Sequence, residues 1–157
     1  MKVAPKVKHS NPSSNEFVFV APSKIEGKGL FARSSILKGT DVVCYQGPLI
    51  SAEEGNLLST QGNRYIFAFN RKFYIDGSVK WNLARHANHS CNPNCEIVKV
   101  NSQVYLRSVR EIPKGEEITY NYGYSFDGYE NNPCLCGAKN CIGFMVLEHH
   151  RNRIKTG

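Results

Sequence analysis

Short apolar segments, broken every few residues by Gly, Pro, Ser or Asn, limit this chain to a mainly β fold. The segments are rich in β-branched and aromatic residues, and no long stretch has the periodicity of a helix. The expected strands cover residues 16–20, 29–32, 42–45, 64–70, 73–75, 96–100, 104–109 and 117–120. One short helix is expected from Ser51 to about Ser59, because Ser51 and Glu54 have the spacing of a capping box. Strands and helices do not alternate, so the sequence predicts a mainly β protein with a few short helices.

The length and charge of the chain indicate one basic domain. Its 157 residues are enough for one hydrophobic core but not for two. The net charge of +7 fits an acidic partner such as nucleic acid, but the Lys and Arg residues are spread along the chain, as in many soluble basic proteins. Residues 1–15 are polar and basic and are expected to form a flexible arm. No segment has the length of a signal-peptide core or a membrane span, so we expect an intracellular protein without membrane contact.

Three of the six cysteines, Cys134, Cys136 and Cys141, lie within eight residues. In a reducing compartment such thiols are more typical of a metal site than of disulfides. Zinc prefers four ligands in a tetrahedron, so a fourth ligand must come from elsewhere in the chain. Cys91 and Cys95 both qualify, and the spacing does not choose between them. The sequence therefore predicts a zinc site with one ligand undecided.

The chain lacks the patterns of common nucleophilic and nucleotide-binding enzymes, such as the Walker loop, the dinucleotide-binding glycines and the G-x-S-x-G turn. Gly27-Lys28-Gly29 is by itself only the pattern of a turn. His89 could act as a base, but a single His is more often a hydrogen-bonded structural residue. Tyr120, Tyr122 and Tyr124 occupy alternate positions, so in a strand they would share one face. A packed aromatic face is the simplest interpretation of that spacing.

Taken in order, these segments resemble the SET-domain protein-lysine methyltransferases from about Phe17 to Met145. The matching segments are G-K-G-L-F-A at 27–32, Y-I-F at 65–67 with Y-I-D-G at 74–77, R-H-A-N-H-S-C-N-P-N at 85–94, G-E-E-I-T-Y-N-Y at 115–122, and the cysteine run at 134–145, which resembles a post-SET zinc module. His86 stands where the family usually has Phe, and Asn121 stands where Asp is commoner. Neither change removes a residue that the chemistry requires.

The resemblance implies a SET-domain fold of several short β-sheets, with a C-terminal pseudoknot in which the chain passes beneath a loop. It divides the chain into a flexible arm (1–15), a SET domain (16–125), a post-SET zinc-binding segment (126–147) and a basic C-terminal tail (148–157). The pseudoknot would bring the N-H-S-C segment at 88–91 beside Tyr122, which no local pattern shows.

The resemblance also implies the site residues. S-adenosylmethionine would be the methyl donor, held by Gly27, Lys28, Gly29, Tyr65, Asn88, His89 and Leu135. A structural zinc ion would be bound by Cys91, Cys134, Cys136 and Cys141. Tyr122 would supply the essential hydroxyl, and the lysine channel would be lined by Tyr65, Tyr120, Tyr124 and Ile97. Leu135 and Phe144 would close the pocket, while Arg85 would brace the surrounding motif.

The function implied by the resemblance is methyl transfer from S-adenosylmethionine to a lysine side chain of a protein, with a histone tail as the favoured substrate. This displacement needs a neutral amine and good alignment, but no strong base. The alternatives are a methyltransferase of non-histone proteins, a catalytically silent SET-like module that binds chromatin, and a zinc-stabilised protein that binds nucleic acid. The location would be nuclear or at chromatin in a eukaryotic or host cell, and cytoplasmic otherwise. Tyr120, two residues before Tyr122, would limit the product to mono- or dimethyl-lysine.

Overall fold

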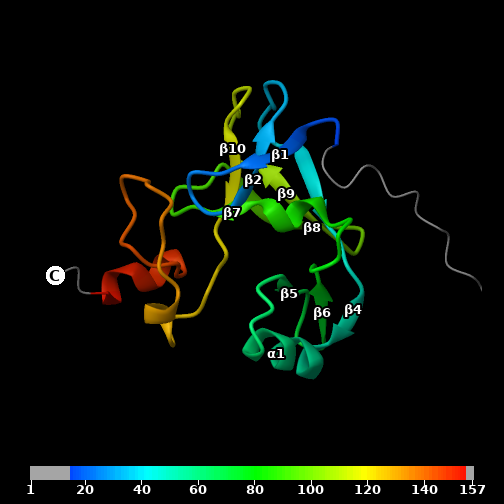
Figure 1. Cartoon of the computed structure of the whole chain (residues 1–157), viewed down its shortest axis with the longest axis vertical. Helices are drawn as coiled ribbons and strands as arrows, with labels where there is room; N and C mark the ends of the chain where they lie inside the picture. The colour runs from blue at the N-terminus through cyan, green and yellow to red at the C-terminus, as the bar shows by residue number, and fades with distance from the viewer. Residues whose placement is uncertain (1–14, 155–157) are drawn as a thin grey trace, which may run out of the picture.

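The computed structural model describes residues 15–154, so nearly all of the predicted arm lies outside the described residues. Within them the chain is mainly β, with one α-helix and a few short 3-10 helices, as predicted (Figure 1). The elements in chain order are β1 (Val18–Pro22), β2 (Lys28–Ala32), β3 (Asp41–Tyr45), β4 (Leu49–Ser51), α1 (Ala52–Thr60), β5 (Ile66–Ala68), β6 (Phe73–Asp76), η1 (Leu83–His86), β7 (Asn88–His89), β8 (Cys95–Val100), β9 (Gln103–Ser108), β10 (Glu117–Tyr120), η2 (Tyr129–Asn131) and η3 (Glu148–Arg153). Each predicted strand recurs with its ends shifted by no more than two residues, and the short strands β4 and β7 have no counterpart in the prediction. No helix among these residues is long and apolar enough to cross a membrane.

The described strands form three small sheets, with the orders β1-β2-β10-β7, β3-β9-β8 and β4-β6-β5. The first two sheets share the main hydrophobic core in the upper part of the molecule (Figure 1). Alternate apolar residues of their strands point inward, as the period of a strand requires. The fully buried side chains of this core include Val18, Leu30, Val42, Val104, Leu106 and Ile118.

Strand β10 lies inside the first sheet and determines where the functional segments meet. It pairs antiparallel with β2 and parallel with β7, with Thr119 opposite Asn88 and Tyr120 opposite His89. A parallel pair needs a long connection, which here runs through β8 and β9. The pairing brings the segment that begins at Asn88 to the end of β10, while the threading of a pseudoknot stays a prediction.

The third sheet and α1 form a separate lobe at the lower right of Figure 1. Ser51 caps α1, because its hydroxyl accepts a hydrogen bond from the Glu54 backbone N–H at 3.1 Å. Two segments connect the lobe to the body, and both contact the buried side chain of Asn82. The Gln46 backbone N–H donates to Asn82 Oδ1 at 3.0 Å, and Asn82 Nδ2 donates to Gly77 O at 2.9 Å. Asn82 therefore bonds to both segments that connect the lobe to the body.

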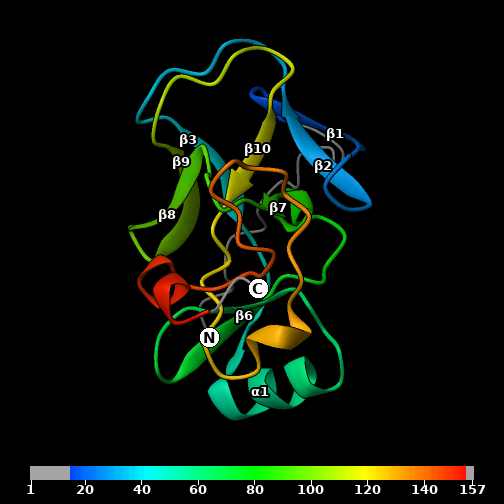
Figure 2. The same ribbon diagram turned by 90° about the vertical axis from the view of Figure 1, so that its left-hand side faces the viewer.

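The described part of the predicted basic tail, residues 148–154, is folded against the rest of the chain. Residues 148–153 form η3, and Ile154 after it is buried. Just before η3, the Leu147 backbone N–H donates a hydrogen bond to Tyr124 O at 3.1 Å. Figure 2 shows η3 in red near the orange loop that carries three of the cysteines. Leu147 and Ile154 give this basic segment an apolar side, which explains why it packs.

Candidate active site

Four cysteine side chains meet where the C-terminal loop lies against the segment after β7. The Sγ atoms of Cys91, Cys134, Cys136 and Cys141 lie within 4.8 Å of one another. Cys95, the alternative to Cys91, is 1% exposed in the main core and is not in this group of described residues. The structure thus brings together the four thiols that the resemblance implied.

The chemistry of this four-cysteine cluster fits a metal ion. Burial, together with the neighbouring Cys136 and Cys141, raises the pKa of the Cys91 thiol to about 11. Burial also acts on Cys136, but hydrogen bonds from the backbone N–H groups of Cys91 and Ala138 outweigh it and lower the pKa of this thiol to about 7. Zinc displaces thiol protons and binds four thiolates in tetrahedral structural sites. Four sulfur atoms at this separation match such a site.

Three tyrosine rings form a row that starts in β10 and continues beyond it. The strand ends at Tyr120, as expected from the sequence, so Tyr122 and Tyr124 do not lie on its face. The chain leaves the sheet because the Tyr122 backbone N–H donates to His89 Nδ1, at 3.1 Å, instead of to a strand. The rings nevertheless pack together, with centroids 4.9 Å apart for Tyr120 and Tyr122 and 5.7 Å apart for Tyr122 and Tyr124.

The Tyr122 hydroxyl is held in a mostly buried position. It donates a hydrogen bond to Ala87 O at 2.9 Å. Burial raises the pKa of Tyr122, and the neighbouring Tyr124 raises it further, so the hydroxyl stays protonated at neutral pH. Burial raises the pKa of Tyr120 in the same way. A phenol that donates to a carbonyl keeps its lone pairs free to accept a hydrogen bond from an amine.

His89 connects the tyrosine row with the cysteine cluster. Its Nδ1 accepts the hydrogen bond from the Tyr122 backbone N–H, which assigns the ring proton to Nε2. Nε2 lies 3.5 Å from Cys91 Sγ and donates to it in this tautomer. Burial and the charge of Arg151 lower the pKa of His89 to about 4, so the ring is neutral at pH 7. Because both ring nitrogens bind protein atoms, only the backbone of His89 is left for the predicted cofactor contact.

Asn88 joins the turn between β1 and β2 to β10. Its Nδ2 lies 3.1 Å from Glu26 O, 3.2 Å from Lys28 O and 2.8 Å from Glu117 Oε1. Gly29 is needed in this arrangement, because a Cβ there would lie 2.2 Å from Glu117 Oε1. Sequence reasoning missed Glu117, although its place as the second acid of the G-E-E segment was an available signal.

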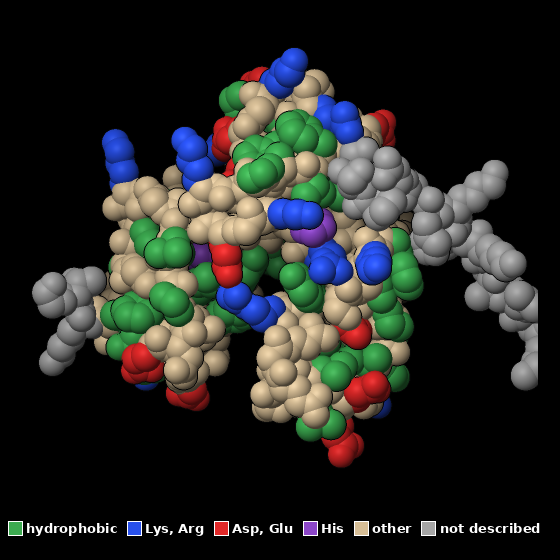
Figure 3. Space-filling model, in the orientation of Figure 1, with side chains coloured by type: hydrophobic (Ala, Val, Ile, Leu, Met, Phe, Trp, Pro, Cys, Tyr) green, Lys and Arg blue, Asp and Glu red, His purple; other side chains and the backbone are tan. Residues whose placement is uncertain are grey.

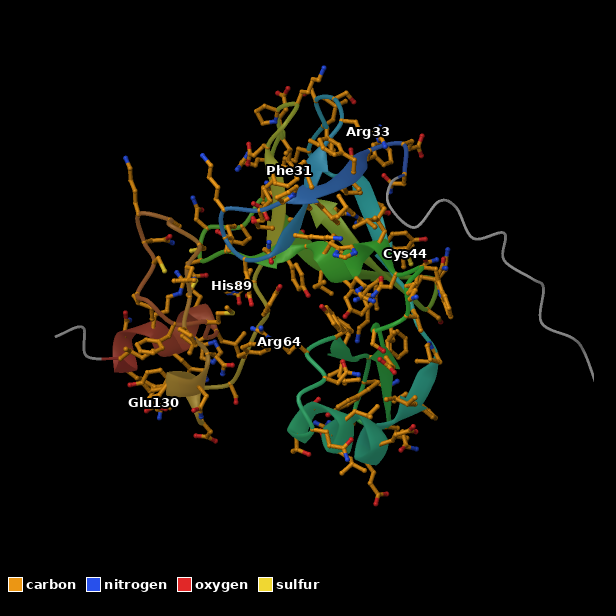
Figure 4. All side chains as sticks on the ribbon, in the orientation of Figure 1. Phe31, Arg33, Cys44, Arg64, His89 and Glu130 are labelled. Carbon is orange, nitrogen blue, oxygen red and sulfur yellow. The ribbon has the colours of Figure 1, made fainter. Side chains whose placement is uncertain are left out.

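A pocket of about 360 Å³ lies between this turn and the C-terminal loop. Its lining residues are Ile25, Glu26, Arg64, Asn131, Asn132, Pro133, Leu135 and Met145. Leu135 is 71% exposed and offers an apolar surface at the rim. Phe144, expected to close the pocket, packs on Tyr129 with ring centroids 5.0 Å apart and is not among the lining residues. Figure 3 shows a hollow between the two lower lobes, and Figure 4 places Arg64 at the upper end of that opening.

The remaining channel residues lie on different elements. The Tyr45 hydroxyl donates to Tyr65 O at 2.8 Å, and the Arg85 guanidinium lies 4.5 Å from the centre of the Tyr65 ring. Ile97, in β8, packs against the main core, as Tyr120 does. Within residues 15–154, no ring contact or hydrogen bond links Tyr65 or Ile97 to the tyrosine row.

A family model described as "SET domain" matches residues 27–123, more than half of the chain. The chain belongs to the SET domain family. The relatives of this SET domain include "Histone-lysine N-methyltransferase 2D" of Homo sapiens, 39% identical over 138 residues, and "Histone-lysine N-methyltransferase trr" of Drosophila melanogaster, 38% identical over 138 residues. A third is "Histone-lysine N-methyltransferase, H3 lysine-4 specific" of Schizosaccharomyces pombe, 35% identical over 134 residues. These matches cover 82%, 82% and 79% of this chain, but only 2%, 6% and 14% of the relatives.

The SET domain thus brings three sets of groups to one junction. The start of β2 is held by Asn88 at Lys28 O, and the Tyr122 hydroxyl is held by Ala87 O. His89 ties the cysteine cluster to the Tyr122 backbone. The pocket beside Leu135 opens at the turn between β1 and β2.

Proposed function

We propose that this SET domain transfers a methyl group from S-adenosylmethionine to a lysine side chain of a protein, with a histone as the substrate. The observation that supports the proposal is that two neighbouring residues hold the two groups: Ala87 O accepts the Tyr122 hydroxyl, and Asn88 bonds to Lys28 O. The printed names of the relatives, all histone-lysine N-methyltransferases, support the same activity and substrate class. On this proposal the protein acts at chromatin, in the nucleus of a eukaryotic or host cell.

The residues around the pocket fit S-adenosylmethionine, which when bound supplies a methyl group attached to a positively charged sulfur. We assign the cofactor to Gly27, Lys28 and Gly29 at the start of β2, to Asn88 and to Leu135, of which Leu135 lines the pocket. Asn88 holds the backbone of the turn through Lys28 O, and Leu135 offers apolar surface for a flat base. The backbone of His89, paired with Tyr120 in the sheet, lies next to Asn88.

The tyrosine row would receive the lysine side chain. A free lysine amine has a pKa of about 10.4 and is almost fully protonated at pH 7. An apolar aromatic channel disfavours the charged ammonium and so favours the neutral amine that the reaction needs. The Tyr122 hydroxyl, which donates to Ala87 O, can accept a hydrogen bond from that amine and align it. His89 has no free ring nitrogen for the proton, so we infer that the proton leaves to solvent.

A zinc ion in the cysteine cluster would have a structural role. Four thiolates leave no open coordination position for substrate or water. The ion would join Cys91, next to the active-site segment, to the loop that carries Leu135 between Cys134 and Cys136. It would therefore fix the apolar rim of the pocket relative to the turn at 27–29.

The test is methyl transfer from labelled S-adenosylmethionine to histones, nucleosomes and a cell lysate, with mapping of the modified residue. We expect lysine methylation of a histone by wild type, and a loss on the order of 100-fold for Tyr122→Phe, because misalignment of the reacting atoms is costly. Cofactor affinity should stay near that of wild type in this variant. Tyr129→Phe is the matched control, because Tyr129 packs on Phe144 and lies outside the tyrosine row.

Cofactor titration separates the alternatives. A silent SET-like module would bind S-adenosylmethionine without turnover, whereas a nucleic-acid-binding protein would bind neither the cofactor nor its product. Methylation confined to non-histone proteins of the lysate would keep the activity and replace the substrate. Near-normal turnover in Tyr122→Phe would remove Tyr122 from the mechanism.

A further inference from the structure

Arg151 reaches from η3 to the cysteine cluster, although it lies outside the cysteine run and outside the family match at 27–123. Its Nη2 donates to Cys91 O at 2.9 Å, and Asn140 Nδ2 donates to the same oxygen at 3.1 Å. Its charge also acts on His89, whose Nε2 donates to Cys91 Sγ. The guanidinium is therefore next to Cys91, the one cysteine of the cluster that does not come from the C-terminal loop.

One atom of Arg151 is not satisfied by the described residues. Its Nε is buried and has no hydrogen-bond partner among them. A buried N–H without a partner is costly, and a guanidinium without a nearby anion is costlier still. The only ion pairs that the described residues form are Arg64–Glu26, Arg107–Asp41 and Arg110–Glu116, so Arg151 has no carboxylate partner in this part of the chain. Its hydrogen bond to Cys91 O places the guanidinium beside the cysteine cluster.

The cluster becomes negative when it holds zinc. Four thiolates and one divalent ion carry a net charge of −2 in a partly buried place, where positive charge and N–H donors stabilise it. N–H donors are present already: the Cys91 N–H lies 3.4 Å from Cys136 Sγ, and the Gly143 N–H lies 3.4 Å from Cys141 Sγ. The Ala138 N–H also donates to Cys136, and His89 Nε2 contacts Cys91 Sγ. These donors are neutral, and Arg151 is the cation that is anchored at Cys91.

We infer that Arg151 is a positioning residue of the cysteine cluster: its guanidinium offsets the charge of the zinc-loaded thiolates and holds the Cys91 carbonyl. The inference rests on zinc binding, as proposed above. η3 holds Arg151 in place, because Leu147 N–H bonds to Tyr124 O before it and Arg153 lies 3.8 Å from the centre of the Phe126 ring after it. The C-terminal segment is thus part of the zinc site.

The test measures zinc affinity of the full chain by competition with a coloured chelator, under reducing conditions. Arg151→Met, which keeps the length and apolar part of the side chain, should weaken zinc binding by about 10-fold, a typical effect for a residue that supports a metal ligand. Arg151→Lys should bind zinc more tightly than Arg151→Met, because it keeps the charge. Arg71→Met, at an exposed arginine outside the C-terminal segment, is the matched control and should match wild type.

Thermal unfolding with and without zinc separates charge compensation from simple packing. If Arg151 acts through the zinc-loaded cluster, Arg151→Met lowers the melting temperature of the zinc-loaded protein more than that of the zinc-free protein. Equal losses in both forms, or unchanged zinc affinity, would overturn the inference. Neither test measures methyl transfer. The inference about Arg151 can therefore be supported or overturned even if the protein has no methyltransferase activity.

Discussion

His89 shows how one side chain can serve two neighbours at the residue scale. Its Nδ1 fixes the backbone of Tyr122 and its Nε2 contacts Cys91 Sγ, so the position of the phenol depends on the cysteine cluster. The ring must be neutral to do both, since a protonated Nδ1 cannot accept the Tyr122 N–H. Protonation of His89 would therefore loosen Tyr122 and the cysteine cluster together.

The depressed pKa of His89 predicts a specific pH dependence of stability. This His has a pKa of about 4 in the fold and 6.5 ordinarily, so between these values the unfolded chain binds more protons. The contribution of His89 is fully present above pH 6.5 and is lost as the pH falls toward 4, by up to about 3 kcal/mol. Urea unfolding of wild type and His89→Gln from pH 7 to 4.5 should show a shallower pH dependence in the variant.

Thiol protonation affects wild type and His89→Gln alike, so their difference reports on His89. Identical pH dependence in wild type and His89→Gln would contradict the assigned neutral state.

Asn88 and Glu117 should act as one unit in cofactor binding. The Asn88 amide holds the turn at Lys28 and is itself held by Glu117 Oε1 at 2.8 Å. Asn88→Ala and Glu117→Gln should each weaken S-adenosylmethionine binding by about 10-fold, and the double variant should lose little more, because residues in one hydrogen-bond network are not additive. Calorimetric titration of the three variants gives the answer.

Glu111→Gln is the control for these variants, because the Glu111 carboxylate is exposed and contacts Ser35 instead. Fully additive losses would show that Glu117 acts without Asn88. Unchanged affinity in Asn88→Ala would remove Asn88 from the cofactor site.

Tyr120 should limit the number of methyl groups added. It is packed against Tyr122, and its hydroxyl can hold a water molecule or accept a hydrogen bond from the amine, which crowds a partly methylated nitrogen. Wild type should yield mono- or dimethyl-lysine, and Tyr120→Phe should shift the product toward higher states. Mass spectrometry of a substrate peptide after extended reaction measures this. Clean trimethylation by wild type, or no shift in the variant, would exclude Tyr120 as the limiting residue.

At the scale of elements, the pairing of β10 with β7 and the loop after η2 build the cysteine cluster from two parts of the chain. Cys91 follows β7, whereas the other three thiols come from the C-terminal loop. Neither part alone has four ligands. Zinc would therefore join them covalently, as a crosslink between the active-site segment and the pocket rim.

This arrangement predicts about one zinc ion per chain and a clear difference between two buried cysteines. Cys91→Ser should weaken zinc retention strongly, because a hydroxyl is a poor replacement for a thiolate ligand. Cys95→Ser should retain zinc, since Cys95 lies in the main core, where burial raises the pKa of its thiol to about 12. Metal analysis of both folded, reduced variants is the measurement. The reverse order of the two variants would show that the wrong fourth ligand is assigned.

At the scale of the whole molecule, three parts surround the hollow seen in Figure 3: the body, the α1 lobe and the C-terminal segment. Asn82 holds the lobe to the body, and Arg64 in the lobe pairs with Glu26 in the body at 2.8 Å. The Arg64 and Glu26 side chains are 61% and 51% exposed, so solvent screens this pair and it adds little stability. The buried amide of Asn82, not the surface pair, sets the position of the lobe.

The sequence by itself determined what depends on neighbours a few residues apart. Strand alternation, the Ser51 cap and the cysteine run at 134–141 all act locally, and the structure confirms the mainly β class and the helix cap. The resemblance also identified the family. Several short motifs in a fixed order are specific for a family even where no single motif is.

Only the tertiary structure decided which distant groups meet. Cys91 and Cys95 are equivalent by spacing, but β7 turns Cys91 toward the loop and β8 buries Cys95 in the core. Likewise, the basic residues after Leu147 give no local signal for packing, yet Arg151 bonds to Cys91 O across 60 positions. Such contacts follow from burial and hydrogen bonding summed over the whole chain, since a local pattern contains no information about its partner.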